Sequence, residues 1–336
     1  MPVRDIDLRE LLKVFTAFLI VQFLGFLMML LVYNNASYSV LSSVSYGQSN
    51  ILYSISIFVS ELIIAVIILL LLIRFLHGAW LYYFMEGAIL LLTLTVFFGV
   101  IISSFLGEAY LFAAGYLLPY VYIIALAISI GFIIAKHKIN SIILRNFIVI
   151  MTSVGLGLLI GIYFGFFFSL IFLVIMAVYD YVSVFITKHM VALAEGSFRY
   201  NLAMMLYFSE TKALDKSSVD KRTLNEIDKD LKKNKEFYKS FKSISNKLNL
   251  SSSYVPLVSA VGLGNGDLAL PLSVVVASVK YSNNFILPLT LIAGGALGLA
   301  LTFYLLYRYR RPLPAIPPLS IGILFAFSLY ILLNIK

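Results

Sequence analysis

Long apolar stretches alternate with shorter polar segments along most of the chain. A continuous apolar run of ~18 residues or more is long enough to cross a membrane as a helix. The pattern therefore predicts an all-α membrane protein with nine transmembrane helices. The predicted spans lie at about 14–33, 51–73, 80–105, 110–135, 147–163, 165–187, 254–279, 286–307 and 315–335.

The apolar stretch 147–187 decides this number, because its 41 residues are too many for a single crossing. Gly161 and Gly165 stand near its middle, in the sequence GIYFG, and glycine allows the chain to turn. We therefore expect one helix to end and the next to begin between these two glycines.

The basic residues support this division and orient the chain. With a cytoplasmic N-terminus, 23 of the 25 Lys and Arg residues fall on the inner side, and only Lys280 and Lys336 fall outside. This asymmetry follows the positive-inside rule. Without the break in 147–187, the 13 basic residues of segment 188–250 would lie outside. The sequence thus predicts a cytoplasmic N-terminus and an external C-terminus.

The spans and the one large polar segment divide the chain into three parts. Residues 1–187 form an N-terminal six-helix part, 188–250 a polar cytoplasmic loop, and 251–336 a C-terminal three-helix part. The loop holds 13 basic and 8 acidic residues, which is typical of a solvated, partly helical segment. A functional alternative is that it gates substrate entry or contacts anionic lipid headgroups.

Composition agrees with a multi-pass integral membrane protein. Hydrophobic residues make up 61% of the chain and charged residues only 12%, whereas soluble domains are ~25% charged. The net charge of +9 is explained by the inner-side segments, so we predict no nucleic-acid partner. The absence of cysteine excludes disulfides, thiolate metal sites and a cysteine nucleophile. The first apolar run has no small-residue cleavage site after it, and we interpret it as a retained span.

Two aspartates, Asp180 and Asp267, stand inside predicted spans. An ionisable group at membrane depth costs at least ~2.5 kcal/mol on insertion scales, and such residues commonly have a function. The two spans are consecutive and antiparallel, so their helices are expected to be neighbours. Two adjacent carboxyl groups hold one proton between them near neutrality. One can then activate a water while the other polarises a peptide carbonyl, as in aspartic proteases.

The alternative for this pair is a structural role, with each acid paired to a buried base. Neither span contains Lys, Arg or His in its apolar interior, which disfavours that alternative. The three histidines, His77, His137 and His189, lie at span edges, and no HExxH motif is present. We therefore predict neither a metal site nor a cofactor.

Glycines precede Asp267 at every second position, in VGLGNGDLALP. Gly262, Gly264 and Gly266 would let helices approach closely and let the backbone bend beside the acid. A helix-packing face with an incidental acid is the alternative interpretation.

Four prolines open the last span, at Pro312, Pro314, Pro317 and Pro318. Proline removes hydrogen-bond donors and favours extended backbone in the preceding residue. We expect the segment Pro314–Pro317 to be extended, to line a polar cavity and to lie beside both aspartates. The alternative is a helix that carries prolines in its first turn.

Three motifs together resemble the presenilin and signal peptide peptidase family of GxGD intramembrane aspartyl proteases, of the archaeal type. They are Tyr179–Asp180, Gly264–Asn265–Gly266–Asp267 and Pro314–Ala315–Ile316–Pro317, on the sixth, seventh and ninth predicted spans. The presenilins have leucine where this chain has Asn265, and the family's proline motif has leucine where this chain has Ile316. Prepilin peptidases, the other membrane GxGD family, fit less well, because they lack the tyrosine–aspartate and proline motifs in this order.

The resemblance implies a nine-helix protease whose catalytic residues are Asp180 and Asp267. It implies that the residues which shape the active site or bind substrate are Tyr179, Gly264, Asn265, Gly266, Pro314, Ala315, Ile316 and Pro317. It further implies transmembrane or signal-peptide substrates in contact with membrane lipids, a location in an archaeal plasma membrane, and no required accessory subunit.

Two other functions remain open at this stage. A secondary transporter could use Glu61, Asp180 and Asp267 as proton or cation sites, since Glu61 also lies within an apolar run. A non-catalytic membrane scaffold is the third possibility.

The outer-side sequence Asn35–Ala36–Ser37 is a glycosylation sequon.

Overall fold

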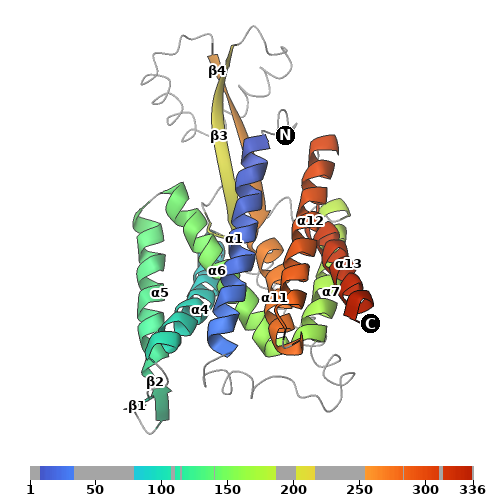
Figure 1. Cartoon of the computed structure of the whole chain (residues 1–336). Helices are drawn as coiled ribbons and strands as arrows, with labels where there is room; N and C mark the ends of the chain where they lie inside the picture. Colours follow the sequence, from blue (N-terminus) through green and yellow to red (C-terminus); the bar gives the residue numbers. More distant parts are fainter. Residues whose placement is uncertain are drawn as a thin grey trace. The chain divides into compact units, whose positions relative to one another are not determined.

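The structure is a computed structural model, and its described residues are dominated by helices (Figure 1). The description covers residues 8–33, 79–106, 110–113, 116–139, 141–186, 202–215, 254–282, 284–309 and 313–334. The predicted span 51–73 with Glu61, the sequon at Asn35, Pro312 and most of the loop 188–250 lie outside these residues.

Eight helices are present in the described ranges, and seven of them are long and apolar enough to cross a membrane. This confirms a largely helical membrane protein, whereas the total of nine crossings stays a prediction. The helices are α1 (Leu8–Tyr33), α4 (Ala79–Leu106), α5 (Tyr120–Lys138), α6 (Ile142–Phe164), α7 (Phe166–Phe185), α11 (Asn265–Ser282), α12 (Ile286–Tyr309) and α13 (Ile316–Asn334).

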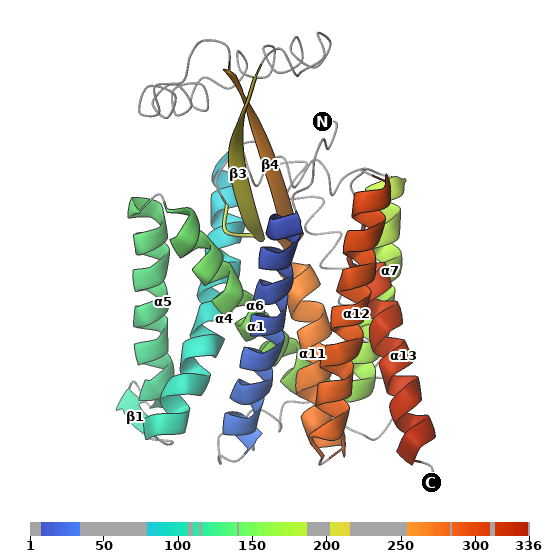
Figure 2. The same ribbon diagram turned by 45° about the horizontal axis from the view of Figure 1, so that its top comes forward.

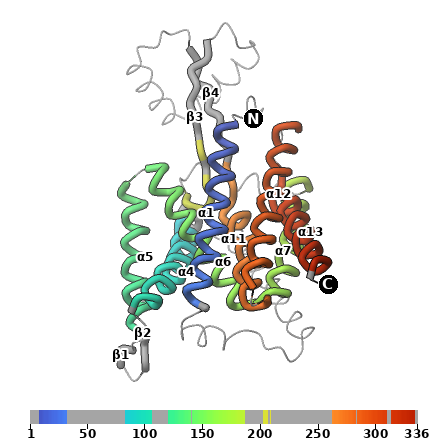
Figure 3. The backbone as a smooth tube through the Cα atoms, in the orientation of Figure 1, coloured from blue at the N-terminus to red at the C-terminus, as the bar shows by residue number. Residues whose placement is uncertain are grey.

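The predicted break within 147–187 is confirmed. Helix α6 ends at Phe164 and α7 begins at Phe166, and Gly165 between them has φ 74°. That backbone region is readily open only to glycine, which explains why the break falls there. The backbone tube turns back between α6 and α7 (Figure 3).

The predicted span 110–135 is wrong over its first ten residues. Strands β1 (Tyr110–Ala113) and β2 (Tyr116–Pro119) form an antiparallel pair in which Tyr110 lies opposite Pro119. Helix α5 starts only at Tyr120. Pro119 lacks an amide hydrogen and favours extended backbone before it, so an apolar run here does not imply a helix.

The predicted span 254–279 is also wrong over its first part. Residues Tyr254–Gly264 form strand β4, which pairs with β3 (Met205–Asp215), and α11 begins at Asn265. Valine favours strands, while Pro256 and the glycines disfavour the interior of a helix. The consequence is that Asp267 lies in the first turn of its helix instead of deep within it.

Two compact units make up the chain. The smaller unit comprises Met1–Leu11 and Phe208–Val261 and includes most of the β3–β4 sheet. The larger unit comprises Leu12–Tyr207 and Gly262–Lys336. It holds nearly all of the helical structure and every residue of the candidate site.

Helix α11 is the central helix of the larger unit. It packs against α6, α7 and α12 (Figures 1 and 2). Every residue from Leu268 to Val279 is buried. A Cβ on Gly161 of α6 would lie 2.5 Å from the carbonyl oxygen of Ser273, so glycine is required for this close approach. Helix α13 packs against both α12 and α7. Helices α7, α11 and α13 carry or adjoin the three predicted motifs. Because α7 contacts both α11 and α13, the three motifs belong to one bundle.

Candidate active site

Asp180 lies near the C-terminal end of α7, and its side chain is buried. Its Oδ2 accepts a hydrogen bond of 3.2 Å from the backbone amide of Ile316, the first residue of α13. The backbone amide of Ala315 also contributes a hydrogen bond to this carboxyl group. The first amides of a helix have no partner within the helix and favour negative charge. The start of α13 therefore supplies the donors that a buried carboxylate needs.

Asp267 is the third residue of α11. Its Oδ2 accepts a hydrogen bond of 3.1 Å from the backbone amide of Gly264, the residue just before the helix. This is one half of a capping box, in which an acidic or amide side chain at the third helical position reaches back to the N-cap amide. A Cβ on Gly264 would lie 3.2 Å from the same oxygen, so the absence of a side chain there leaves room for the carboxylate.

The helices that carry the two aspartates, α7 and α11, pack against each other. Each aspartate accepts backbone amides at a helix start, Asp180 from α13 and Asp267 from the start of its own helix. The arrangement can therefore hold one ionised and one protonated carboxyl group inside a helical bundle.

The side chain of Asn265 is bonded to α6. Ser153 Oγ donates to its Oδ1, and its Nδ2 donates to Thr152 Oγ1 over 3.3 Å. Its backbone amide donates to the carbonyl oxygen of Met204 over 3.0 Å. These contacts indicate that Asn265 fixes the turn before Asp267, so any influence on substrate choice would be indirect.

The remaining motif residues differ in their surroundings. No atom lies within 4 Å of the position that a Cβ of Gly266 would take, so this residue borders open space. Tyr179 is 40% exposed on α7, although it is adjacent to Asp180 in the sequence. Its predicted role in shaping the active site stays a prediction.

The proline segment lies at Asp180 as expected, but its conformation is only partly as predicted. Leu313, Pro314 and Ala315 are outside any helix, whereas α13 begins at Ile316 and includes Pro317. The prediction of extended backbone is therefore wrong for Ile316 and Pro317. Proline is readily accepted in the first turn of a helix, where amides have no helical partner, and this explains the early helix start.

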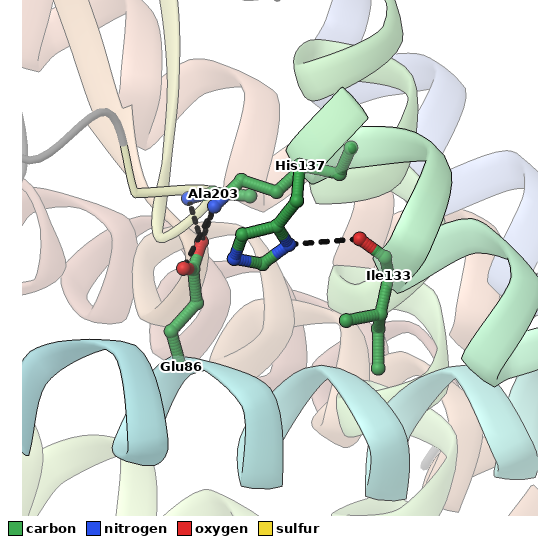
Figure 4. A network of polar contacts seen from close by, with 5 residues as sticks. Glu86, Ile133, His137 and Ala203 are labelled. Atoms are coloured by element: carbon green, nitrogen blue, oxygen red, sulfur yellow. Dashed lines mark hydrogen bonds and ion pairs between the residues drawn. The ribbon is translucent and has the colours of Figure 1, made fainter. Parts of the chain in front are cut away.

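Sequence reasoning missed Glu86 and Lys136. Lys136 of α5 donates to both carboxylate oxygens of Glu86 on α4, at 2.5 and 2.7 Å, and both side chains are buried (Figure 4). The available signal was the acid within the apolar run 80–105, which has the same character as Asp180. Lys136 stands at the polar end of its apolar run, among the basic residues of the inner side, so the sequence gives no sign that it pairs with Glu86.

Comparison with known proteins identifies the family. The chain matches the family described as signal-peptide peptidase, presenilin aspartyl protease, over residues 15–334. No curated protein sequence gives a match.

The chain also matches solved structures described as presenilin family intramembrane aspartate proteases. One, in space group C222, has a TM-score of 0.54 and 19% identity, covering 95% of this chain and 96% of that one. A second, in space group P2, has a TM-score of 0.49 and 22% identity, covering 92% and 96% respectively. Because the family match spans nearly the whole sequence, this integral membrane protein belongs to the signal-peptide peptidase and presenilin family of intramembrane aspartyl proteases.

Proposed function

We propose that Asp180 and Asp267 are the catalytic pair of this protease. The observation that supports the proposal is that the two acids stand on helices that pack against each other, α7 and α11, and that each accepts a backbone amide at a helix start. They are also the acids of the Tyr179–Asp180 and Gly264–Asp267 motifs, by which the sequence resembles the family.

The proposed chemistry follows from one proton shared by two carboxyl groups. The ionised group takes a proton from a water, whose oxygen attacks the carbonyl carbon of the scissile peptide bond. The protonated group donates its proton to the carbonyl oxygen, and a tetrahedral intermediate forms. When this intermediate collapses, the carboxyl group that took the proton from water gives it to the leaving nitrogen, and the C–N bond breaks. A hydroxyl group of the intermediate gives its proton to the other carboxylate as it becomes the carbonyl of the product acid, so the pair again holds one proton.

The proline segment is proposed to help dock an extended substrate. A peptide bond within a helix is shielded by its own hydrogen bonds, so a transmembrane substrate has to be unwound locally before it is cut. Leu313–Ala315 is non-helical and precedes the amide that contacts Asp180. An extended substrate could pair edge-wise with such backbone and recover its lost hydrogen bonds. Transmembrane proteins and signal-peptide remnants, held within membrane lipids, are the substrates that this mode of binding favours.

The proposed topology has nine transmembrane helices and a cytoplasmic N-terminus, and the proposed location is an archaeal plasma membrane. The three-part division at residues 187 and 250 belongs to the same proposal. The one-sided distribution of basic residues supports the orientation. The chain has no cysteine, so a single introduced cysteine would be the sole labelling site. An impermeant maleimide should label a cysteine near Lys336 in intact cells and one near Pro2 only after lysis; the reverse pattern would invert the topology.

Cleavage by purified protein tests the catalytic pair. Wild type should cut a transmembrane substrate reconstituted with it, and Asp180→Ala or Asp267→Ala should each abolish cutting. Membership of the protease family favours this function over the transporter alternative. Glu61, the third acid of that alternative, lies outside the described residues. If either variant still cut the substrate, the assignment of Asp180 and Asp267 as the catalytic pair would be wrong.

A further inference from the structure

The buried ion pair between Glu86 and Lys136 has a third partner. The backbone amide of Ala203 donates a hydrogen bond to Oε1 of Glu86, the oxygen that Lys136 also approaches (Figure 4). Ala203 and its neighbour Leu202 are themselves buried. One carboxylate thus joins α4, α5 and the segment that leads into β3. Of the two side chains in the ion pair, only Glu86 can accept a hydrogen bond from this amide, because a lysine side chain has donors alone.

The segment held by Glu86 is bonded directly to the start of α11. The carbonyl oxygen of Met204, one residue after Ala203, accepts the backbone amide of Asn265 over 3.0 Å. The neighbouring amide, that of Gly264, donates to the carboxylate of Asp267. The adjacent amides of Asn265 and Gly264 therefore link the segment held by Glu86 to Asp267, because the first donates to Met204 and the second to the carboxylate.

A cavity of about 220 Å³ lies behind this turn. Its wall includes Glu86, Ala203, Met204, Asn265 and Gly266. A turn next to open space is not fixed by close packing on that side. On that side its position depends on hydrogen bonds, among them the one from Asn265 to Met204.

A simpler role for the ion pair would be to fasten α4 to α5. Buried ion pairs are often replaceable by apolar residues without loss of stability, so such a fastening alone gives little reason for two buried charges. The amide of Ala203 distinguishes fastening of the two helices from positioning of the turn. It needs an acceptor at position 86 whether or not that acceptor is charged, whereas a helix fastening does not.

We propose that Glu86 is a positioning residue for Asp267. By accepting the amide of Ala203, it fixes Met204, whose carbonyl oxygen fixes the first residue of α11. Lys136 orients the Glu86 carboxylate and neutralises its charge within the bundle. This inference rests on the proposed catalytic role of Asp267, which it extends to residues on α4 and α5.

Two double variants separate the acceptor from the charge pair. Glu86→Leu with Lys136→Met removes the ion pair and the acceptor for Ala203. Glu86→Gln with Lys136→Met removes the ion pair but keeps an acceptor oxygen at position 86. Both variants lack unpaired buried charge, so both are expected to insert. The leucine variant leaves the buried amide of Ala203 without an acceptor, so it should unfold at a lower temperature than the glutamine variant.

The expected result is a difference in turnover and not in binding. For a reconstituted transmembrane substrate, kcat of the leucine variant should be at least ~10-fold below that of the glutamine variant, with KM within ~2-fold. Hydrogen exchange at the Asn265 amide should be faster by a similar factor in the leucine variant alone. Equal turnover and equal exchange in the two variants would overturn the proposal and leave only a fastening of α4 to α5.

A second experiment removes only the donor. Replacing Ala203 by the corresponding α-hydroxy acid turns its amide into an ester and leaves every side chain in place. Turnover should fall and exchange at Asn265 should rise, even if the leucine variant fails to fold; wild-type values for both would overturn the proposal. Exchange at Asn265 is measured without substrate. It therefore tests the link to the turn even if Asp267→Asn proves active and the catalytic assignment fails.

Discussion

The backbone amide of Ile316 lies 3.2 Å from Oδ2 of Asp180, although 136 residues separate the two in the chain. Ile316 is the first residue of α13, and the carbonyl oxygen of Ala315 before it accepts the amide of Leu319. A helix start is thus directed at a carboxylate on another helix. Such a start offers free amides and a partial positive charge without a basic side chain, which suits a carboxylate in an apolar bundle.

Removing the Ile316 amide should slow catalysis more than removing its side chain. Ile316→Pro deletes the donor to Asp180, and proline is well tolerated at the first position of a helix. A hydrogen bond to a charged group contributes ~1.5–3 kcal/mol, so kcat should fall by roughly 10- to 100-fold. Ile316→Ala keeps the amide and is the matched control for the lost side chain. Equal kcat values for the two variants would show that the amide has no catalytic role.

Asp180→Asn and Asp267→Asn should each eliminate proteolysis while the protein remains folded. Asparagine keeps the shape and an acceptor oxygen for the amides of Ile316 and Gly264, but it cannot transfer a proton. Cleavage should fall by at least ~100-fold, the lower end for loss of a general acid or base. The measurement is substrate cleavage together with thermal unfolding in detergent. Either variant cutting at more than a few per cent of the wild-type rate would contradict the assignment.

The rate of cleavage should depend on pH as a bell-shaped curve. Activity requires one ionised and one protonated carboxyl group. At low pH both groups are protonated and no base remains, whereas at high pH both are ionised and no acid remains. The profile of kcat/KM for a substrate without titratable groups near the cut site provides the measurement. A rate that is constant from about pH 4 to 9 would exclude a shared proton.

Apolar length and glycine were sufficient to predict much of the helical plan. The break at Gly165 is an example, since the required conformation, φ 74°, is a local property of one residue. Apolar length failed at 110–119 and 254–264, because strands and helices both accept apolar runs and pairing with a second strand decides between them. Such pairing is not encoded within either segment alone.

The candidate site was predictable where chemistry stood out against its surroundings. Asp180 and Asp267 are acids in apolar runs, and the prolines mark the segment at Asp180. Glu86 has the same signal, but its partners are Lys136 on the next helix and an amide 117 residues away. No spacing in the sequence relates these groups. The orientation of Asn265 towards Ser153 and Thr152 likewise depends on how α6 packs against α11.

The two glycines of the Asp267 turn should respond differently to substitution by alanine. A Cβ at position 264 would lie 3.2 Å from Oδ2 of Asp267, tighter than ordinary van der Waals contact, whereas a Cβ at position 266 would meet nothing within 4 Å. Gly264→Ala should therefore displace the carboxylate that the Gly264 amide holds. Because a small displacement of a reacting group can cost ~100-fold, kcat should fall by ~10-fold or more with little change in KM.

Gly266→Ala is the control for effects of these substitutions on the stability of the fold. Gly266 lies within α11, and alanine in a helix is more stable than glycine by roughly 0.5–1 kcal/mol. Its unfolding temperature in detergent should therefore rise, while that of Gly264→Ala should fall or stay unchanged. Kinetics of Gly264→Ala measured beside this stability comparison separate displacement of Asp267 from a general effect on folding. Wild-type kcat in Gly264→Ala would mean that the Gly264–Asp267 contact does not set the position of the catalytic carboxylate.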